Sequence, residues 1–438
     1  MKYRKTICSL FLAAFATGVF AQSGTNSPYS QYGFGVLNDH ATGFNKGMDG
    51  LGQAIRQGNQ VVPQNPASFS AVDSLSLIFD VGMSGQITNF SENGVKKNAK
   101  NANFEYAVGA FRAFRHFGVS FGILPFSNVG YKYSSTGALN QERDVNYVNT
   151  YSGSGGLRQV YLGAGWEPFR NLSVGASLSY LWGEVNRVVA NNYSNGSGAS
   201  LSTINTLTKT YQADVSNYKL DFGMQYTLPL NKTDKVVVGA TFSPKHNLSA
   251  TPECIVLSTN TSTGVSNSST YSVEDGLELP NMFGAGVTWY HSNQILLGAD
   301  FTLQQWGKTS FPVYQVINDV PSYVLDKNYF KDRQRVTVGG EYCRNPFARH
   351  FMSRIRYRLG ASYTTPYYNI NNHEGPKELS VSAGFGIPII NTLNNRSVLN
   401  VSGQWVHLSG DGLITENTFR LNIGITFNER WFMKWKVE

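Results

Sequence analysis

Two groups of residues in this sequence are candidates for a functional site because of their residue types and spacing. The first contains a candidate nucleophile. The run GVSFG, residues 118–122, has the Gly-x-Ser-x-Gly pattern of hydrolases. In that pattern the serine occupies a sharp turn between a strand and a helix, whereas Ser120 lies inside a continuous alternation of apolar and polar residues. His116 is the nearest base, but along an extended chain it lies about 13 Å away. The sequence therefore predicts no catalytic residue.

The second group is a set of arginines with a spacing of two. They begin the run RIRYRLGASY, residues 354–363, and recur in DRQRVTVGGEY, residues 332–342. Alternate residues of a strand share one face, and arginines on such a face could bind a carboxylate ligand through charge-assisted hydrogen bonds. The candidate ligand-binding residues are Arg333, Arg335, Arg354, Arg356 and Arg358. The alternative is that they pair with acids of the protein, for which the candidates are Glu341, Asp300, Asp39 and Asp49.

Composition argues against several other functions. The net charge is +8, but three of the positive residues lie among the first five, and the rest are scattered except for Lys96, Lys97 and Lys100. A nucleic-acid partner is therefore not expected. The seven histidines include no His-x-x-x-His pair, and neither Cys254 nor Cys343 belongs to a Cys-x-x-Cys motif. We accordingly expect no metal site and no cofactor.

The first residues predict export. Basic residues precede an apolar run, and Val19 and Ala21 fit the small-residue rule for cleavage, so residues 1–21 are expected to form a secretory signal peptide. No later segment has the 18 consecutive apolar residues of a spanning helix. The 44 Gly, 24 Tyr and 27 Phe favour many strands over a helical bundle. An exported chain of this kind is either a large soluble β protein or an outer-membrane barrel.

Alternation favours the barrel, because a strand between lipid and a lumen is apolar at every second position. In HFGVSFGI, residues 116–123, Phe117, Val119 and Phe121 face one way, and small or polar residues face the other. Arginines at alternate positions could face a wet lumen but not a dry core without partners. We count fourteen such segments, at 74–90, 103–112, 116–133, 157–167, 171–189, 213–228, 234–246, 280–290, 294–306, 333–343, 353–364, 377–387, 396–408 and 417–428.

The connections between these segments alternate in length. Outer-membrane barrels alternate long extracellular loops with short periplasmic turns, and here the long connections are 91–102, 134–156, 190–213, 247–279 and 307–332. An even number of strands then places both termini in the periplasm. Aromatic residues near the strand ends are candidates for the interfacial girdles of such barrels. They are Trp166, Tyr180, Trp182, Trp289, Tyr290, Trp306, Tyr342 and Trp405.

Residues 22–73 show no such alternation. They are rich in Gly and Asn and contain VVPQNPASFS, residues 61–70, which suits neither a helix interior nor a central strand. Irregular backbone at membrane depth is tolerated when it is buried in protein or lines a cavity, and a barrel of fourteen strands is wide enough to hold a plug. We therefore expect an N-terminal hatch, with Asn65, Pro66 and Ala67 at its exit into the barrel wall.

With these features the chain resembles the FadL-type family of outer-membrane transporters for long-chain fatty acids and other hydrophobic compounds. The resemblance covers the chain after residue 21. It rests on GMDGLGQA followed by NPASFS, on LPNMFGAGVTWY with LLGADFTLQQW, and on DRQRVTVGGEY and RLGASYTTPY. The family's Asn-Pro-Ala-Gly is Asn-Pro-Ala-Ser here. The resemblance implies an all-β fold, a 14-stranded antiparallel transmembrane β-barrel with an N-terminal hatch, in the outer membrane of a Gram-negative cell.

The resemblance also implies a function without enzymatic chemistry. Hydrophobic small molecules such as long-chain fatty acids would be captured by the loops, pass the hatch and leave sideways into the bilayer through a kink in the third strand. Pro125 has no N–H and must interrupt the ladder or lie at an edge, so we expect the lateral gate there; the alternative is a proline near a barrel rim. The expected partners are the outer-membrane lipid bilayer and a hydrophobic, fatty acid-like ligand, and the chain is expected to be a monomer.

The expected division is a signal peptide at 1–21, a hatch at 22–73, a β-barrel at 74–428 and a C-terminal tail at 429–438. A second hypothesis is a FadL-like barrel that serves as a protein-interaction or secretion-system shuttle component, since fold does not fix function. A third is an outer-membrane lipase. The first hypothesis predicts an apolar pocket and an interrupted wall, the second a large ordered external surface, and the third a Ser–His pair within hydrogen-bonding reach.

Overall fold

The computed structural model describes residues 24–140, 145–195, 204–346, 348–370, 373–389 and 397–430. The expected signal peptide, residues 1–21, lies outside them, as do residues 431–438 of the expected tail. Among the described residues, no helix is long and apolar enough to cross a membrane.

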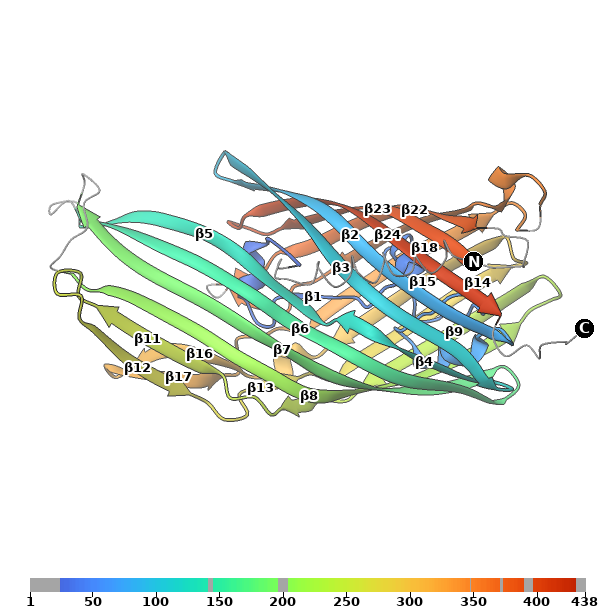
Figure 1. Cartoon of the computed structure of the whole chain (residues 1–438), viewed down its shortest axis with the longest axis horizontal. Helices are drawn as coiled ribbons and strands as arrows, with labels where there is room; N and C mark the ends of the chain where they lie inside the picture. The colour runs from blue at the N-terminus through green and yellow to red at the C-terminus, as the bar shows by residue number, and fades with distance from the viewer. Residues whose placement is uncertain are drawn as a thin grey trace, which may run out of the picture.

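The strands close into a 14-stranded antiparallel barrel (Figure 1), which confirms the fold class predicted from the alternation. Two strands, β4 and β5, share the third position, and β2 pairs with β24 to close the ring. The barrel strands are β2 (Ser76–Glu92), β3 (Val95–Phe114), β4 (Phe117–Pro125), β5 (Ser127–Asn140), β6 (Val145–Phe169), β7 (Leu172–Asn195), β8 (Thr206–Pro229), β9 (Asp234–Ser243), β14 (Met282–His291), β15 (Ile295–Gln304), β18 (Arg333–Cys343), β19 (Arg356–Thr364), β22 (Lys377–Ile389), β23 (Ser397–Ser409) and β24 (Thr415–Arg430).

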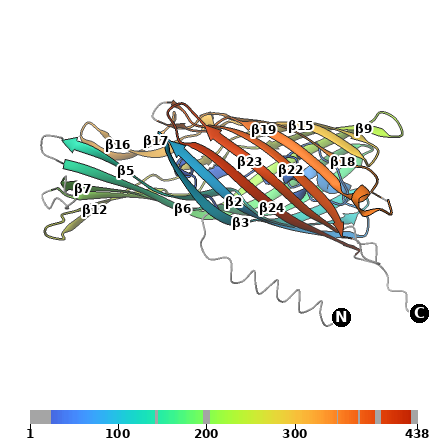
Figure 2. The ribbon, with the colours of Figure 1, turned by 90° about the horizontal axis from the view of Figure 1, so that it is seen from above.

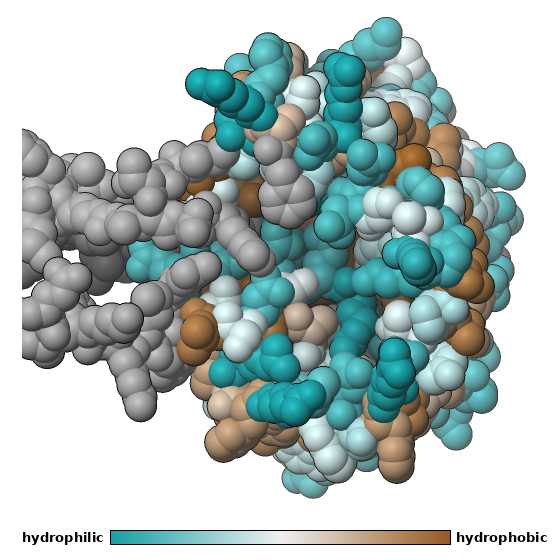
Figure 3. Space-filling model, turned by 90° about the vertical axis from the view of Figure 1, so that its right-hand side faces the viewer, coloured by the Kyte–Doolittle hydropathy of each residue, from teal (hydrophilic) through white to brown (hydrophobic). Residues whose placement is uncertain are grey.

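Side chains alternate across the barrel wall as the sequence predicts. On β19 the side chains of Leu359 and Tyr363 are 66% and 45% exposed on the outside, while Arg358 and Ser362, each one residue earlier, are buried. At the end of the barrel that carries the short turns, hydrophilic residues gather in the middle and hydrophobic residues lie along the rim (Figure 3). An apolar outer band around a polar interior is the arrangement that a bilayer stabilises.

The expected aromatic girdle is wrong at two positions. Tyr290 is 5% exposed and Trp306 is fully buried, so neither can lie at a lipid interface. Tyr290 follows the outward-facing Trp289 on β14 and therefore points inward. Trp306 lies beyond the end of β15, where a short 3-10 helix, η3 (Trp306–Lys308), turns it into the protein.

The long connections are largely strands rather than loops. β6, β7 and β8 contain 25, 24 and 24 residues, whereas β14 and β15 contain 10 each, and about 9 to 11 residues suffice to cross a membrane. The excess length forms a sheet that extends beyond one end of the barrel (Figures 1 and 2). The remaining elements near this end are β10 (His246–Leu248), β11 (Glu253–Thr259), β12 (Ser266–Ser272), β13 (Leu277–Leu279), β16 (Phe311–Ile317), β17 (Val320–Asp326), β20 (Asn369–Ile370) and β21 (His373–Glu374).

Sequence alternation failed to predict this external sheet for a physical reason. Both of its faces lie beyond the apolar band, so no face must be apolar along its whole length. The segment SNSSTYS of β12, for example, is mostly exposed and almost wholly polar. Because long loops of outer-membrane barrels are extracellular, we assign this end to the cell exterior and the short-turn end to the periplasm.

Residues 24–73 fill the barrel. They form β1 (Val36–Leu37) and three short helices, η1 (Pro28–Gln31), α2 (Gly43–Lys46) and η2 (Pro66–Ala71). The wall makes room for η2 with a row of glycines that are in register across β4, β6, β7 and β8: Gly118, Gly165, Gly175 and Gly223. A Cβ on Gly175 would lie 2.4 Å from the carbonyl carbon of Pro66. Only glycine permits so close an approach of the two backbones.

The third strand position is interrupted. β3 and β4 stay paired only as far as Ala107 and Ile123. β4 then ends at Pro125, and β5 continues at Ser127 along β6 alone, apart from two residues paired with β1. β6 bends opposite the break at Gly156, whose φ of +133° favours glycine. Over the described residues, the upper part of β3 therefore has no strand partner on the side of β5.

Candidate functional site

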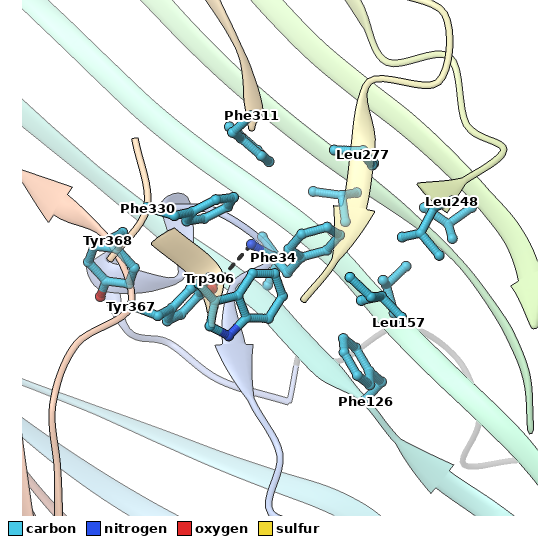
Figure 4. Packing of buried hydrophobic residues seen from close by; sticks show 14 of the residues in the cluster. Phe34, Phe126, Leu157, Leu248, Leu277, Trp306, Phe311, Phe330, Tyr367 and Tyr368 are labelled. Carbon is cyan, nitrogen blue, oxygen red and sulfur yellow. Dashed lines mark hydrogen bonds between the residues drawn. The ribbon is translucent and has the colours of Figure 1, made fainter. Parts of the chain in front are cut away.

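An aromatic cluster occupies the extracellular half of the lumen. Trp306 is its centre, with ring centroids 5.3 Å from Phe34, 5.3 Å from Phe330 and 5.2 Å from Tyr367 (Figure 4). Phe34 belongs to the N-terminal segment, and its N–H donates to the Tyr367 hydroxyl at 3.1 Å. Residues from four distant parts of the chain thus form one cluster, which we call the aromatic cluster; its buried members are Tyr29, Phe34, Phe126, Val129, Tyr131, Leu157, Leu181, Val185, Val215, Leu248, Ala250, Leu277, Leu279, Trp306, Phe311, Phe330, Tyr367, Tyr368 and Ile370.

A cavity of about 210 Å³ adjoins the aromatic cluster. Its lining combines the N-terminal segment around Tyr32, the wall strands β5, β7 and β8, and the β16–β17 hairpin. Most of the lining is aromatic or aliphatic, and the aromatic rings are Tyr32, Phe34, Tyr131, Tyr211, Phe311, Tyr314, Tyr323 and Tyr329. An apolar cavity with a few polar groups is the usual form of a small-molecule site. We refer to it below as the aromatic cavity.

Arg187 of β7 is the charged residue that lines this cavity. Its side chain is buried, its guanidinium donates to the carbonyl oxygen of Gly33, and it lies 5.8 Å from the centroid of Phe311. Its Nε has no hydrogen-bond partner, and Arg187 makes no ion pair with any acid in the described part of the chain. Burial raises the pKa of the Tyr329 phenol, so this neighbour carries no negative charge that could pair with Arg187. A buried guanidinium without a counter-ion favours an anionic group in the cavity.

The gap between β3 and β5 is closed by the start of the N-terminal segment. On one lip, the Asn26 side chain donates to the Lys100 carbonyl at 3.2 Å. On the other lip, the Gly130 N–H donates to the Ser30 hydroxyl at 3.1 Å, and Val36 of β1 pairs with Asn128 of β5. The gap is therefore sealed by residues 24–37 rather than by a strand of the wall.

Pro125, the expected gate residue, lies at the edge of this gap. The N–H of the next residue, Phe126, donates to Leu157 of β6 at 2.8 Å. Successive backbone N–H groups of an extended chain point to opposite sides, so the nitrogen of Pro125, which has no hydrogen, faces β3. The proline removes a donor on the side where the ladder stops.

Three of the five arginines predicted to bind ligand are paired with acids of the protein itself. Arg358 and Arg356 both pair with Glu341, and the contact from Arg358 Nε measures 2.7 Å between side chains that are 1% and 3% exposed. Arg335 lies 3.5 Å from Asp39 and donates to the Asp49 carbonyl at 2.7 Å. Two of the four acids named as alternatives thus belong to the N-terminal segment, and Arg335 holds that segment to the wall.

The other two arginines lie elsewhere. Arg354 is not on β19, as expected, but in a short 3-10 helix, η4 (Phe351–Arg354), at the periplasmic turn. The strand β19 begins only at Arg356. Arg333 lines a second, polar cavity of about 130 Å³ below the aromatic cavity. The sequence pattern could not show these differences because it fixes the face of a residue only where the chain is already extended.

The polar cavity is electrically balanced. Burial acts to raise the pKa of Asp39, but Arg335 and Lys46 lower it further, and the pKa stays below its usual range. Burial, followed by the charge of Lys219, lowers the pKa of His40 to about 4, so the ring is neutral at pH 7. Asp300 accepts the N–H groups of residues 52 and 53 at 2.6 and 2.8 Å. These groups fix the N-terminal segment within the barrel.

Asn65, Pro66 and Ala67 form the start of η2. The Asn65 side chain accepts the Ala67 N–H at 3.0 Å as the helix cap and donates to the Gln53 carbonyl at 2.7 Å. All three residues are buried against β6, β7 and β8. They thus form a capped turn inside the lumen rather than a free linker, a result that follows from Asn being a strong N-cap and Pro being suited to the first helical position.

Ser120 and His116 do not form a catalytic pair. The Ser120 hydroxyl is buried and bonds to the Gly109 carbonyl and the Tyr161 hydroxyl, while His116 occupies the β3–β4 turn and lies 3.9 Å from Glu167. Among the described residues, no group of three His, Cys, Asp or Glu side chains could hold a metal ion. The chemistry of this interior is ion pairing and apolar burial.

Comparison with known proteins agrees with this geometry. The profile of the family described as BamG matches residues 3–438. No curated protein matches the chain. Among solved structures, CymD, a monoaromatic hydrocarbon channel, is 15% identical and aligns over 92% of this chain and 100% of its own with a TM-score of 0.59. The Ralstonia pickettii toluene transporter TbuX is 14% identical over 89% and 98%, with a TM-score of 0.59.

A Pseudomonas aeruginosa FadL homologue is 11% identical and aligns over 89% of this chain and 98% of its own, with a TM-score of 0.55. At these identities the likeness establishes the fold, and it confirms the FadL-type resemblance at that level. A closed barrel with this fold and an apolar outer band belongs in the outer membrane of a Gram-negative cell.

Proposed function

The chain belongs to the BamG family and has the barrel fold of the FadL-type transporters, and from this premise we propose that it takes up small hydrophobic molecules that carry an acidic group. The aromatic cavity with its unpaired Arg187 is the observation that carries the proposal. Ligand would enter from the extracellular end, bind against the aromatic cluster and leave through the gap between β3 and β5. No covalent step is required, and a monomer contains the whole path.

The size of the aromatic cavity limits the ligand. An engineered apolar cavity of about 150 Å³ binds benzene, and the cavity here is about 210 Å³. One ring with a short substituent fits, whereas a long acyl chain would need the cavity to open. Two structurally similar proteins, a monoaromatic hydrocarbon channel and a toluene transporter, agree with a ligand of this size. We therefore favour a compact aromatic or branched acid over a long-chain fatty acid.

Arg187 supplies the selectivity for an acid. A carboxylate bound to a buried guanidinium forms charge-assisted hydrogen bonds worth about 1.5 to 3 kcal/mol. The five arginines proposed from the sequence are less suited to this role, because Arg335, Arg356 and Arg358 already face protein carboxylates. If one of them did bind ligand, Glu341 would first have to release Arg356 or Arg358, or the N-terminal segment would have to release Arg335.

Binding of matched ligands tests the role of Arg187. We expect the purified protein to bind benzoate-like acids more tightly than the corresponding neutral hydrocarbons by calorimetry. Arg187→Met should lower acid affinity by roughly ten- to a hundredfold and leave hydrocarbon affinity nearly unchanged. Arg356→Met is the matched control, since its guanidinium is paired with Glu341. Equal loss for both ligands, or for both variants, would contradict the assignment.

A cross-link tests the exit. Val36 and Asn128 face each other in register on β1 and β5, at a separation of about 4.5 to 5.5 Å that suits a disulfide. In a background with Cys254 and Cys343 replaced by Ala, the pair Val36→Cys and Asn128→Cys should close the gap under oxidation. Uptake into liposomes should stop and return on reduction, while ligand binding persists. Undiminished uptake in the oxidised form would remove the gap from the path.

A specific observation supports a second function, protein interaction on the same scaffold. The external sheet is large and ordered, and over the described residues β5 from Tyr131 to Asn140 hydrogen-bonds through its backbone to β6 alone. A free strand edge can pair with a strand of another protein. A photo-reactive residue at the exposed Thr136 should then cross-link to one defined protein in cells, whereas one at Leu257 of β11, which is exposed but paired on both sides, should not. Absence of any such product would leave uptake as the better function.

A further inference from the structure

The outer wall carries a hollow over five strands, β22, β23, β24, β2 and β3. These strands lie side by side in the wall (Figure 2). In register across β22, β23, β24 and β2 lie Ala383, Gly403, Leu421 and Gly85. A Cβ on Gly403 or on Gly85 would meet no heavy atom within 4 Å, so both face open space. Small residues among large ones thus leave a depression of about 810 Å³ in a surface that otherwise projects apolar side chains.

Large aromatic side chains form the upper wall of this hollow. Trp405 of β23 and Ile87 of β2 both lie in register with Phe419 of β24. Trp405 and Phe419 also line a second hollow, of about 520 Å³, which lies toward the extracellular end. The two hollows are therefore continuous, and we call them together the outer groove.

The outer groove changes character along its length. Its lower part is lined mainly by apolar atoms, and Lys100 lies at the upper edge of that part. Its upper part is lined by Lys96 and Lys97 together with asparagine side chains. None of these three lysines makes an ion pair with an acid in the described part of the chain, and none of the residues lining either hollow is acidic. The positive charge at the top of the groove is therefore uncompensated.

The direction of this gradient matches the membrane. The three lysines lie on β3 near the β2–β3 hairpin, at the extracellular end, whereas Gly85 and Gly403 lie deeper, among outward-facing apolar residues. The apolar part therefore faces acyl chains of the outer leaflet and the basic part faces its headgroups. Clustered lysines beside a membrane attract anionic lipids.

We propose that the outer groove is a binding site for a lipid of the outer leaflet that carries phosphate on its headgroup. One acyl chain occupies the hollow above Gly85 and Gly403, and Lys96, Lys97 and Lys100 bind the phosphate. A free phosphate ion would gain nothing from the apolar half of the groove. A docked protein segment would complement the three unpaired lysines only if it were acidic at that depth. The lipid therefore fits the whole groove best.

Native mass spectrometry of the mature protein tests this site with three probes: lipid A, which carries phosphate, diacylglycerol, which does not, and inorganic phosphate. We expect lipid A to be retained at least about tenfold better than diacylglycerol. The combined variant Lys96→Glu, Lys97→Glu and Lys100→Glu should bring the two lipids to near parity. The variant Gly85→Leu with Gly403→Leu should weaken both lipids, since it fills the hollow from two positions at which a Cβ meets no heavy atom within 4 Å.

Matched controls keep the test specific. Lys327→Glu reverses another exposed extracellular charge, and Ala285→Leu enlarges an outward-facing residue of β14 on a distant part of the wall; neither should alter lipid retention. Heat-modifiable migration in gels checks that each variant is folded. Unchanged lipid A binding in both groove variants, displacement by inorganic phosphate, or equal losses in the controls would overturn the proposal. So would a copurifying protein that Gly85→Leu removes.

Discussion

The two ends of the lumen are held together by different forces. Toward the extracellular end, rings from distant segments surround Trp306 with centroid distances near 5 Å and leave an aromatic cavity beside Arg187. Toward the periplasm, the buried ion pair Lys46–Glu105 fixes the N-terminal segment to the wall, and Arg358–Glu341 joins two strands of the wall itself. Apolar contacts are non-directional and tolerate a cavity, whereas a buried ion pair is strongly destabilised when one partner is lost.

This comparison separates binding from anchoring. Changes at the aromatic end should alter ligand affinity more than the free energy of unfolding, because residues that line a cavity make no packing contacts on the cavity side. Changes at the ion-paired end should alter stability or the position of residues 24–73 more than affinity. Four experiments, in order of decreasing expected effect, test whether ligand affinity and stability depend on different ends of the lumen.

The largest effect is expected at Glu341. Glu341→Leu leaves Arg356 and Arg358 without their carboxylate in a buried site, so the free energy of unfolding should fall by about 3 to 5 kcal/mol. Urea unfolding in detergent micelles, followed by tryptophan fluorescence, measures it. Replacing both arginines with Met in the same variant should recover most of the loss. A loss confined to ligand affinity would contradict the division.

A smaller effect is expected at the glycine row. Gly175→Val places a side chain against the backbone of Pro66, so η2 must move, at a cost of roughly 1 to 3 kcal/mol. Limited proteolysis should cut residues 53–70 faster while the barrel stays intact. Gly403→Val, which meets no atom within 4 Å, is the matched control. If both variants resist proteolysis equally, the row does not position the segment.

Filling the aromatic cavity should act on binding alone. Ala213 of β8 lines the cavity and is only partly buried. Ala213→Phe should lower ligand affinity about tenfold, equivalent to about 1.4 kcal/mol, with little change in unfolding. Calorimetric titration measures the affinity, and Ala285→Phe on the outer wall is the control. Unaltered binding would move the ligand site away from this cavity.

The smallest effect is expected at the cap of η2. Asn65→Ala removes the side chain that accepts the Ala67 N–H, and loss of such a cap destabilises by about 1 kcal/mol. Asn65→Asp keeps the acceptor but not the donation to the Gln53 carbonyl. Comparing the two by urea unfolding separates the bonds. Uptake that is slowed by Asn65→Ala without loss of stability would indicate that this turn moves during transport.

Local patterning predicted most of the barrel. The period-2 alternation in segments such as HFGVSFGI fixes which side chain faces lipid, because a strand turns successive residues to opposite faces regardless of its neighbours. It failed at Trp306 and Arg354, which lie just beyond strand ends, where the face of a residue is no longer set by its position along the chain. It failed also in the external sheet, whose faces need not differ in polarity.

The candidate site was predicted less well. The arginines at 335, 356 and 358 were placed correctly on the inner face. Which acid meets Arg356 and Arg358 depends on the register of β18 and β19, and which acid meets Arg335 depends on how residues 39 and 49 are threaded through the barrel. Arg187 carried no signal in the sequence, since a single arginine in a polar stretch is ordinary. Only its buried, unsatisfied Nε and the lack of an ion pair with any acid among the described residues make it notable.

Local sequence specifies the strands that cross the membrane, their count, their inward and outward faces and the proline that breaks the third strand, because each of these depends on the geometry of a few consecutive residues. The contacts between distant segments depend on the tertiary structure. Phe34, Trp306 and Tyr367 meet, residues 24–37 seal the gap, and Gly85 lies in register with Leu421 beside Gly403 because the barrel closes. Such contacts join segments hundreds of residues apart, and no local pattern specifies them.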